Sequence, residues 1–126
     1  MLRALLPMAT VLVAAAIVIA VLESGGDDPA ARAADRRVTI VLDDFRYRPQ
    51  TIRARAGRLS VVLLSRGRLG HNFNLRKGGR PVVKVSTLKP GVRESERLDL
   101  SRGDYRMFCS IANHEELGMY GTLTVR

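Results

Sequence analysis

The sequence predicts an all-β fold: an antiparallel Greek-key β-sandwich preceded by an N-terminal transmembrane or signal helix. Short segments in which apolar and polar residues alternate recur along most of the chain, and turn residues separate them. The first 22 residues differ, because they form a long apolar run behind a positively charged N-terminus. We therefore divide the chain into a signal or anchor helix (residues 1–22), a flexible polar tether (residues 23–37) and one domain (residues 38–126).

The N-terminal segment is uncharged from Ala4 to Leu22 and follows Arg3. At about 1.5 Å per residue, a helix over this run is about 28 Å long, close to the hydrocarbon thickness of a bilayer. Two interpretations stay open: a signal peptide with a small-residue cleavage site after Ala33, or a retained membrane anchor, which the length of the run favours. In both cases Arg3 favours a cytoplasmic N-terminus. We therefore expect an extracytoplasmic domain, in the periplasm or on the outer face of the cell membrane.

The tether and the charge of the chain limit the possible partners. The tether, ESGGDDPAARAADRR, is small and polar, which is typical of a flexible linker. The net charge is +9, with 21 Lys and Arg against 12 Asp and Glu. A basic domain can bind nucleic acid, anionic lipid or an acidic protein. Because the basic residues are scattered singly along strands and the domain is expected outside the cytoplasm, we expect no nucleic-acid partner.

The first half of the domain contains strands with a clear alternation. RVTIVL places Val38, Ile40 and Leu42 on one face, and FRYRP then directs Phe45 and Tyr47 inward. TIRARAG repeats the pattern, with arginines between its apolar residues. RLSVVLLS is apolar almost throughout, as expected of a strand that is buried on both faces.

The second half of the domain continues in the same way. HNFNL, VVKVSTL, SERLDL, DYRMFCSI and GTLTVR are the remaining predicted strands, separated by the turn-rich segments RGRLG, KGGRP, KPGVRE and SRGD. No segment of the domain shows a helical apolar period. LSRGDY, which ends at Tyr105, is typical of a tyrosine corner, in which a tyrosine hydroxyl fixes a Greek-key connection.

One loop concentrates the residues that can bind a metal. YRMFCSIANHEELGMYGTLTV contains the only cysteine, Cys109, and one of two histidines, His114. The spacing C-x4-H-x4-M allows a loop that leaves the predicted strand at Cys109 to bring His114 and Met119 back toward the sulfur. Thiolate, imidazole and thioether ligands suit copper, and a trigonal His2Cys site with a long axial methionine is typical of blue-copper electron-transfer centres. His71 is the only histidine left to complete such a site.

Other interpretations of these residues are weaker. A lone cysteine is often a small buried hydrophobic residue, and Met119 or either histidine could be structural. All of them nevertheless fall on one motif. A Cys–His nucleophile needs an oxyanion hole and an orienting partner, and the sequence supplies no recognisable one, so we expect no enzyme. Zinc would be unusual with methionine as a fourth ligand. A binuclear copper centre needs two cysteines in the loop, and this chain has only one, so that alternative is excluded.

The chain resembles the cupredoxin family of plastocyanin- and azurin-like blue copper proteins. The resemblance rests on GHNF (residues 70–73) and on the cysteine loop, and it extends over FRYRPQTIRARAG and LKPGVRESERLDLSRGDY to essentially all of residues 38–126. It implies one type 1 copper ion, with the residues His71, Cys109 and His114 as equatorial ligands and Met119 as the axial ligand.

The resemblance also implies supporting roles for two residues next to His71. Asn72 would tie the two ligand-bearing segments together and help to orient the thiolate. Gly70 would offer its backbone carbonyl as a distant further contact to the metal.

The function implied by the resemblance is the transfer of single electrons between a redox donor and a redox acceptor. In the family the second histidine is usually the exposed edge, so His114 would be the docking point, with Ala112 and Leu117 in its apolar rim. The basic domain favours an acidic partner, whereas Glu115 and Glu116 would make the surface near the imidazole more acidic than usual. An alternative that uses the same residues is a copper-binding protein for storage, delivery or sensing, without electron transfer.

Overall fold

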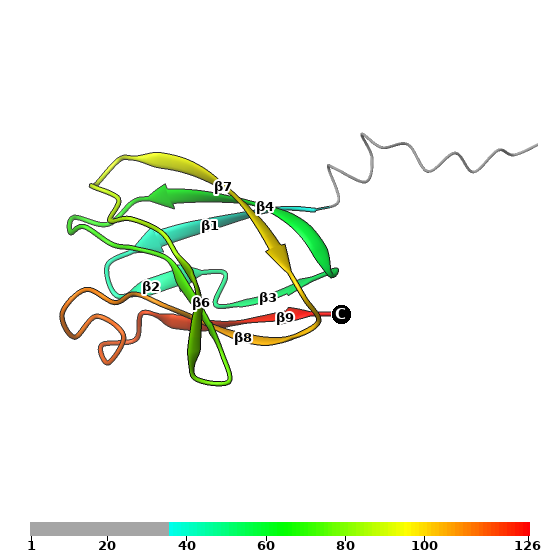
Figure 1. The fold of residues 1–126 in the computed structure, drawn as a ribbon. Coiled ribbons are helices and arrows are strands. Elements are labelled where there is room, and N and C mark those ends of the chain that lie inside the picture. Colours follow the sequence, from blue (N-terminus) through cyan, green and yellow to red (C-terminus); the bar gives the residue numbers. More distant parts are fainter. Residues whose placement is uncertain (1–35) are drawn as a thin grey trace, which may run out of the picture.

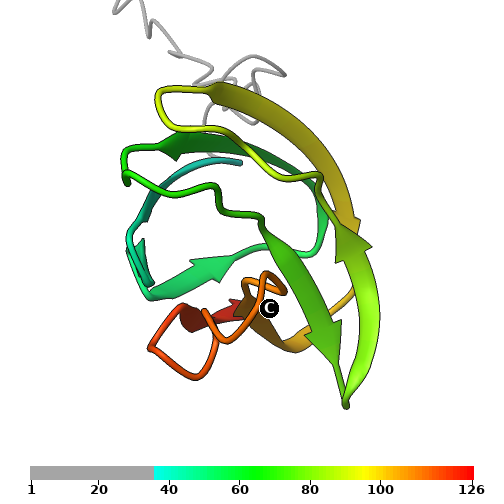
Figure 2. The same cartoon turned by 90° about the vertical axis from the view of Figure 1, so that its left-hand side faces the viewer.

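Nine strands in two facing sheets make up the described part of the protein, residues 36–126 of a computed structural model (Figures 1 and 2). The first sheet contains, in spatial order, β2 (Arg46–Arg48), β1 (Arg37–Asp43), β4 (Gly57–Ser65) and β7 (Arg93–Leu100). The second contains β3 (Thr51–Ala54), β9 (Tyr120–Val125), β8 (Gly103–Phe108), β5 (Asn74–Lys77) and β6 (Arg80–Lys84). The predicted all-β sandwich is therefore confirmed.

The N-terminal predictions lie mostly outside the described residues. This holds for the helix of residues 1–22 and for residues 23–35 of the tether. Within residues 36–126, no helix has the length and hydropathy needed to cross a membrane. β1 begins at Arg37, which is the first residue of the predicted strand RVTIVL and the last residue assigned to the tether.

The antiparallel prediction is wrong for two strand pairs. β1 pairs with β4 in parallel, and β3 pairs with β9 in parallel. The reason is a crossover: after β2 the chain leaves the first sheet, forms β3 in the second, and returns to place β4 beside β1. A connection that passes through the opposite sheet brings the next strand back in the same direction, whereas a hairpin reverses it. The other pairs in the two sheets are antiparallel.

The core lies between the two sheets and follows the predicted alternation. Inward-facing aliphatic side chains from both sheets meet there, as in β1, where Ile40 and Leu42 are buried. β4, which lies between β1 and β7, is buried along most of its length, as its continuous apolar run predicts. The tyrosine corner is also confirmed, because the Tyr105 hydroxyl donates a hydrogen bond of 2.7 Å to the Ser101 carbonyl.

One end of the sandwich carries the loops that matter for function. β1, β4 and β8 all run toward this end, which lies on the left in Figure 1 and faces the viewer in Figure 2. There the segment after β4 lies beside the end of β1, with the Arg66 amide donating to the Leu42 carbonyl at 2.8 Å. The loop from β8 to β9 lies at the same end. We call this end the loop end.

Candidate metal centre

The loop between β8 and β9 is closed by its own backbone. The Cys109 amide donates to the Met119 carbonyl at 3.1 Å, and the Met119 amide donates to the His114 carbonyl at 2.9 Å. The His114 amide in turn donates to the Ile111 carbonyl at 3.0 Å. Ala112 has a positive φ of 42°, which lets the chain turn back toward the sulfur. The three predicted ligands of the loop are therefore held by short local connections.

His71 reaches the same place from a different part of the chain. It precedes β5 and forms an isolated antiparallel bridge with Leu88. The His71 amide donates to the Leu88 carbonyl at 3.1 Å, and the Leu88 amide donates back to the His71 carbonyl at 2.8 Å. This pair fixes the backbone of the histidine, which is fully buried.

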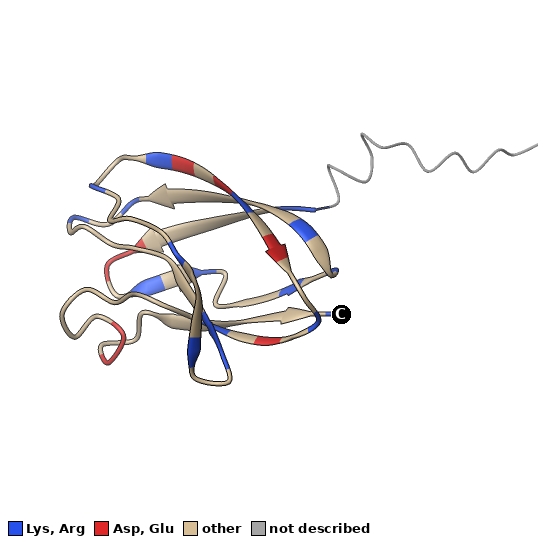
Figure 3. Ribbon diagram, in the orientation of Figure 1, with Lys and Arg blue, Asp and Glu red and all other residues tan. Residues whose placement is uncertain are grey.

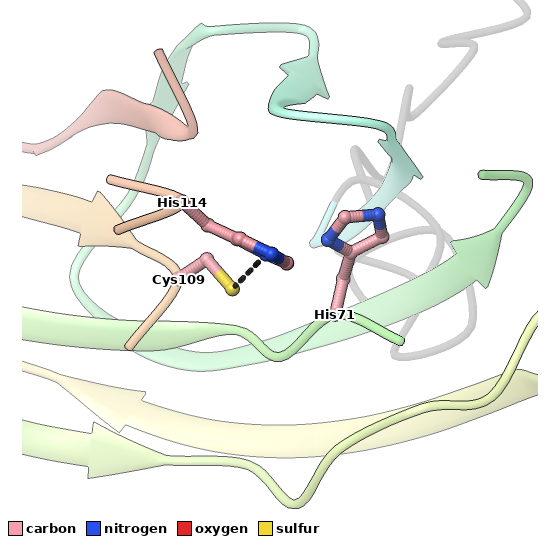
Figure 4. Close-up of side chains that lie close together, drawn as sticks. All are labelled: His71, Cys109 and His114. Carbon is pink, nitrogen blue, oxygen red and sulfur yellow. Dashed lines mark hydrogen bonds between the residues drawn. The ribbon is translucent and has the colours of Figure 1, made fainter. Parts of the chain in front are cut away.

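The structure brings the predicted equatorial ligands together. One donor atom from each of His71, Cys109 and His114 lies within 4.8 Å of the others, and all three residues are buried (Figure 4). The Cys109 Sγ lies 3.6 Å from His114 Nδ1, and the two imidazole centroids are 5.1 Å apart. Met119, the predicted axial ligand, is fully buried and bonded through its backbone to both other ligands of the loop.

The cluster fits a soft metal ion. His71 Nδ1 is buried and has no hydrogen-bond partner among residues 36–126, an arrangement that costs free energy unless the lone pair binds another group. Burial lowers the pKa of His114, and the neighbouring His71 ring lowers it further, whereas the charge of Asp44 acts in the opposite direction. A neutral imidazole is the form that binds metals. The donor set of two imidazoles, one thiol and one thioether matches type 1 copper.

Asn72 has the geometry expected of a link between the two ligand-bearing segments. Its Oδ1 accepts a hydrogen bond of 2.9 Å from the Ser110 amide, and its Nδ2 donates to the Ser110 hydroxyl at 2.9 Å. Asn74 Nδ2 donates to the same Asn72 Oδ1 at 2.9 Å, and the buried Tyr47 hydroxyl donates to the Asn72 carbonyl at 2.6 Å. The segments that carry His71 and Cys109 are thus joined by side-chain hydrogen bonds.

Phe45 does not occupy the position that its alternating segment predicted. It lies in the turn between β1 and β2 with a φ of 60°, and it is half-buried instead of entering the core with Tyr47. Its ring stands edge-on to His114, with centroids 5.0 Å apart, and more loosely against His71 at 6.4 Å. Strand alternation did not predict the position of Phe45, because β1 ends at Asp43 and the turn that follows has no two-residue period.

Asp44 is a functional candidate that the sequence did not reveal. Its Oδ1 lies 3.0 Å from His71 Nε2, the ring nitrogen that the metal would not use. The hydrogen bond from His71 and those from the amides of Arg68 and Leu69 lower the pKa of Asp44 to about 2. No local signal could have joined Asp44 to His71, because they are 27 residues apart in the sequence.

The expectation of an acidic surface beside His114 is wrong for Glu115. Its carboxylate accepts two hydrogen bonds from Arg76, at 2.6 and 3.1 Å, and one from Arg106 at 2.8 Å. Burial alone would raise the pKa of Glu115, but these arginines outweigh it and hold the pKa below its ordinary value. The negative charge is therefore neutralised by side chains from β5 and β8, whereas Glu116 is exposed.

The remaining predicted residues lie at the loop end. Leu117 and Ala112 are exposed, as a docking rim requires, and Leu69 from the other ligand-bearing segment is exposed as well. Gly70 is partly buried, and a Cβ at this position would lie 3.1 Å from the Thr87 methyl group, so the packing favours glycine. The structure gives no contact that assigns a ligand role to the Gly70 carbonyl.

Solved structures support the fold of the sandwich. The chain is similar to dithionite-reduced auracyanin from the photosynthetic bacterium Roseiflexus castenholzii, with 18% identity and a TM-score of 0.67, over 72% of this chain and 97% of that chain. It is similar to a purple cupredoxin from Nitrosopumilus maritimus, with 17% identity, a TM-score of 0.54 and coverages of 71% and 99%. A reduced amicyanin variant matches with 21% identity, a TM-score of 0.56 and coverages of 77% and 89%.

Sequence comparison identifies the family. No curated protein sequence matches the chain. The family model described as a cupredoxin-like domain matches residues 11–125, which is most of the chain. The sandwich, the buried cluster of His71, Cys109 and His114, and the buried Met119 are all consistent with this match. The chain therefore belongs to the family of cupredoxin-like domains.

Proposed function

We propose that the protein is a one-electron carrier with a single type 1 copper ion, held outside the cytoplasm by an N-terminal membrane tether. The observation that carries the proposal is the buried cluster of His71, Cys109 and His114, in which His71 Nδ1 has no hydrogen-bond partner in the described part of the chain. When bound, copper would supply one-electron chemistry by alternating between Cu(II) and Cu(I).

The role of the protein in this chemistry is to keep the donor atoms in fixed positions. The thiol and both imidazoles are buried, so water is kept from the sulfur. The backbone bridge at His71 and the side-chain links through Asn72 and Ser110 fix the two segments relative to each other. Because these contacts do not depend on the charge of the metal, the donors rearrange little when an electron arrives or leaves.

His114 is the most exposed of the four predicted ligands. It is 8% exposed, whereas His71 and Met119 are fully buried and Cys109 is 1% exposed. Exposed apolar side chains surround this end, with Leu117 52% exposed and Leu69 45% exposed. We call Leu69, Ala112 and Leu117 the docking rim. An exposed apolar patch of this kind supports brief contact with another protein.

The tether and the location follow from the predicted N-terminal segment. β1 starts at Arg37 and runs toward the loop end, so the sandwich begins at the end away from the predicted metal ligands (Figure 1). A tether attached there leaves the docking rim free for a partner. Confinement near a membrane raises the effective concentration of partners in the same membrane. This arrangement supports an anchored carrier.

The proposed partner surface is acidic. Lys and Arg residues are distributed over both sheets (Figure 3). Two of them, Arg76 and Arg106, form ion pairs with Glu115 beside the docking rim. Opposite charges steer association, and salt screens this steering. The rate of electron exchange with an anionic redox reagent should therefore fall as ionic strength rises, and the rate with a cationic reagent should rise.

Copper storage or delivery would use the same ligands but needs a donor set that an acceptor can reach. The burial of His71, Cys109 and Met119 favours retention of the metal through many redox cycles. Incubation of the Cu(I) form with a soluble Cu(I) chelator separates the two functions. A carrier should lose its copper slowly and keep it through repeated oxidation and reduction, whereas rapid quantitative transfer would favour delivery.

Leu117→Asp tests docking through the rim. Val82→Asp is a matched control, because Val82 is 50% exposed on the edge strand β6 and the same charge is introduced. We expect Leu117→Asp to slow electron self-exchange between the Cu(I) and Cu(II) forms by about tenfold or more, since the charge must be desolvated in the encounter. NMR line broadening measures the rate. Equal effects of the two substitutions would contradict docking at Leu117.

A further inference from the structure

A carboxylate contacts the outer nitrogen of one ligand histidine. In Figure 4 one ring nitrogen of His71 faces His114 and Cys109, and the other points away from them. The nitrogen that points away is Nε2, and Asp44 Oδ1 lies 3.0 Å from it. Because a carboxylate oxygen only accepts, the proton must lie on Nε2. The lone pair is then on Nδ1, the buried nitrogen that has no hydrogen-bond partner within the described residues.

The carboxylate is itself fixed by the backbone. Asp44 Oδ1 also accepts hydrogen bonds from the amides of Arg68, at 2.9 Å, and Leu69, at 3.2 Å. Arg68 Nε lies 3.6 Å from the other oxygen, Oδ2. These donors keep the carboxylate ionised and leave it little freedom to turn away from His71. The Asp44 side chain is about three-quarters buried, so water screens its charge only in part.

Gly67 makes room for this contact. A Cβ at position 67 would lie 2.3 Å from Asp44 Oδ1 and 2.9 Å from His71 Nε2. It would also lie 2.9 Å from the Asp44 amide nitrogen. Any side chain at position 67 would therefore force the carboxylate and the imidazole apart. The contact between Asp44 and His71 therefore requires glycine at position 67.

We propose that Asp44 is a positioning residue that selects the metal-binding tautomer of His71 and lowers the reduction potential of the copper site. This inference rests on the proposed copper function. A hydrogen-bonded carboxylate makes the imidazole a stronger electron donor, and partners of this kind affect metal affinity by about 10–100-fold. A fixed negative charge also favours the more highly charged Cu(II) over Cu(I). Both effects stabilise the oxidised form.

Two substitutions separate the charge from the hydrogen bond. Asp44→Asn keeps an oxygen that can accept from His71 Nε2 and the two amides, but it removes the charge. We expect Cu(II) affinity to fall about tenfold with little change for Cu(I), and a tenfold change in this ratio raises a one-electron potential by about 59 mV. Asp44→Ala removes both features, so we expect a loss of Cu(II) affinity of about 10–100-fold and mixed His71 tautomers.

Asp43→Asn is the matched control, since it removes the same charge one residue earlier. Asp43 pairs with Arg48 and has no contact with either ligand histidine in the described residues. Voltammetry gives the potential, copper titration gives the affinity, and nitrogen-15 NMR of the copper-free protein reports the His71 tautomer. Gly67→Ala should change the tautomer as Asp44→Ala does, although it leaves the charge in place.

Each measurement can overturn part of the proposal. If Asp44→Asn and Asp43→Asn shift the potential equally, the contact with His71 has no special effect on the metal. If copper-free Asp44→Ala keeps the Nε2-protonated tautomer, the positioning role is wrong. The tautomer measurement needs no metal, so it tests Asp44 even if the full chain binds no copper. Failure of copper binding in the unsubstituted protein would count against the proposed function instead.

Discussion

At the scale of single residues, Cys109 is central to the proposed chemistry. It follows the last residue of β8, and its sulfur lies against His114 Nδ1 in a buried position. We expect Cys109→Ser to abolish the intense blue thiolate absorption, because serine has no soft thiolate to donate charge to Cu(II). The free energy of unfolding of the copper-free protein should fall by only about 0.5–3 kcal/mol.

Visible spectroscopy of the copper-loaded variant and urea unfolding of the copper-free variant check this prediction. Ser95→Ala, at an exposed position of β7 in the other sheet, serves as the control and should stay blue. A blue site that survives in Cys109→Ser would exclude Cys109 as the ligand.

Tyr47 gives a prediction about alkaline pH. Burial is the main cause that raises its pKa far above the ordinary value of 10.0, and its hydroxyl donates to the Asn72 carbonyl at 2.6 Å. The folded protein thus keeps a proton that the unfolded chain loses above about pH 10. The stability contributed by this group is complete below about pH 10 and falls as the pH rises above it, by about 1.4 kcal/mol per pH unit.

Tyr47→Phe should therefore be less stable than the unsubstituted protein at pH 8, by about 1–3 kcal/mol for the lost hydrogen bond. The gap should narrow as pH rises above about 10, because phenylalanine has no proton to lose. Urea unfolding of both proteins at several pH values from 8 to 11 measures this difference in the free energy of unfolding. A gap that widens with pH would show that the sign is wrong.

The ligands were predictable residue by residue, and so was the link through Asn72, whereas the contact of Asp44 with His71 was not. Cys109, His114 and Met119 lie on one loop, so spacing alone brought them together. Asp44 meets His71 only because β1 and the segment after β4 end side by side, and that neighbourhood depends on the tertiary fold.

At the scale of structural elements, the link between β7 and β8 shows how a single side chain fixes a connection. The Tyr105 hydroxyl donates to the Ser101 carbonyl at 2.7 Å, four residues back in the sequence. Tyr105→Phe keeps the buried ring and loses this bond, so the free energy of unfolding should fall by about 0.5–1.5 kcal/mol.

Urea unfolding measures this loss. The slope of the free energy of unfolding against urea concentration should stay unchanged, because it reports the surface exposed on unfolding. Tyr120→Phe is a suitable control, since Tyr120 is an exposed residue of β9 whose hydroxyl has no hydrogen bond within the described residues. Equal losses in the two variants would contradict a specific role for the corner.

Alternation located most of the strands but could not give their partners. It placed one strand at HNFNL, residues 71–75, whereas β5 spans Asn74–Lys77. The buried positions of β1 and β4 were visible in the sequence because the side-chain period of a strand is two residues. The parallel pairing of these strands was not visible, because it depends on the path of the chain through the opposite sheet. The turn at Phe45 was missed for a related reason: a positive φ leaves no mark in an apolar pattern.

At the scale of the whole molecule, the proposed point of attachment to the tether and the proposed metal site lie at opposite ends of the sandwich. β1 begins at one end of the sandwich, and the predicted metal ligands and the docking rim lie at the other, the loop end (Figure 1). Both sheets pack on a common core, so the two ligand-bearing segments are held in one frame. The central claim is that this frame assembles one type 1 copper site from His71, Cys109, His114 and Met119.

The most direct test is to add one equivalent of Cu(II) to the purified full chain and record its visible and EPR spectra. The account predicts an intense thiolate-to-copper absorption and a narrow copper hyperfine splitting, both lost in Cys109→Ser. A pale Cu(II) spectrum with ordinary hyperfine splitting, or no binding by the folded protein, would contradict it.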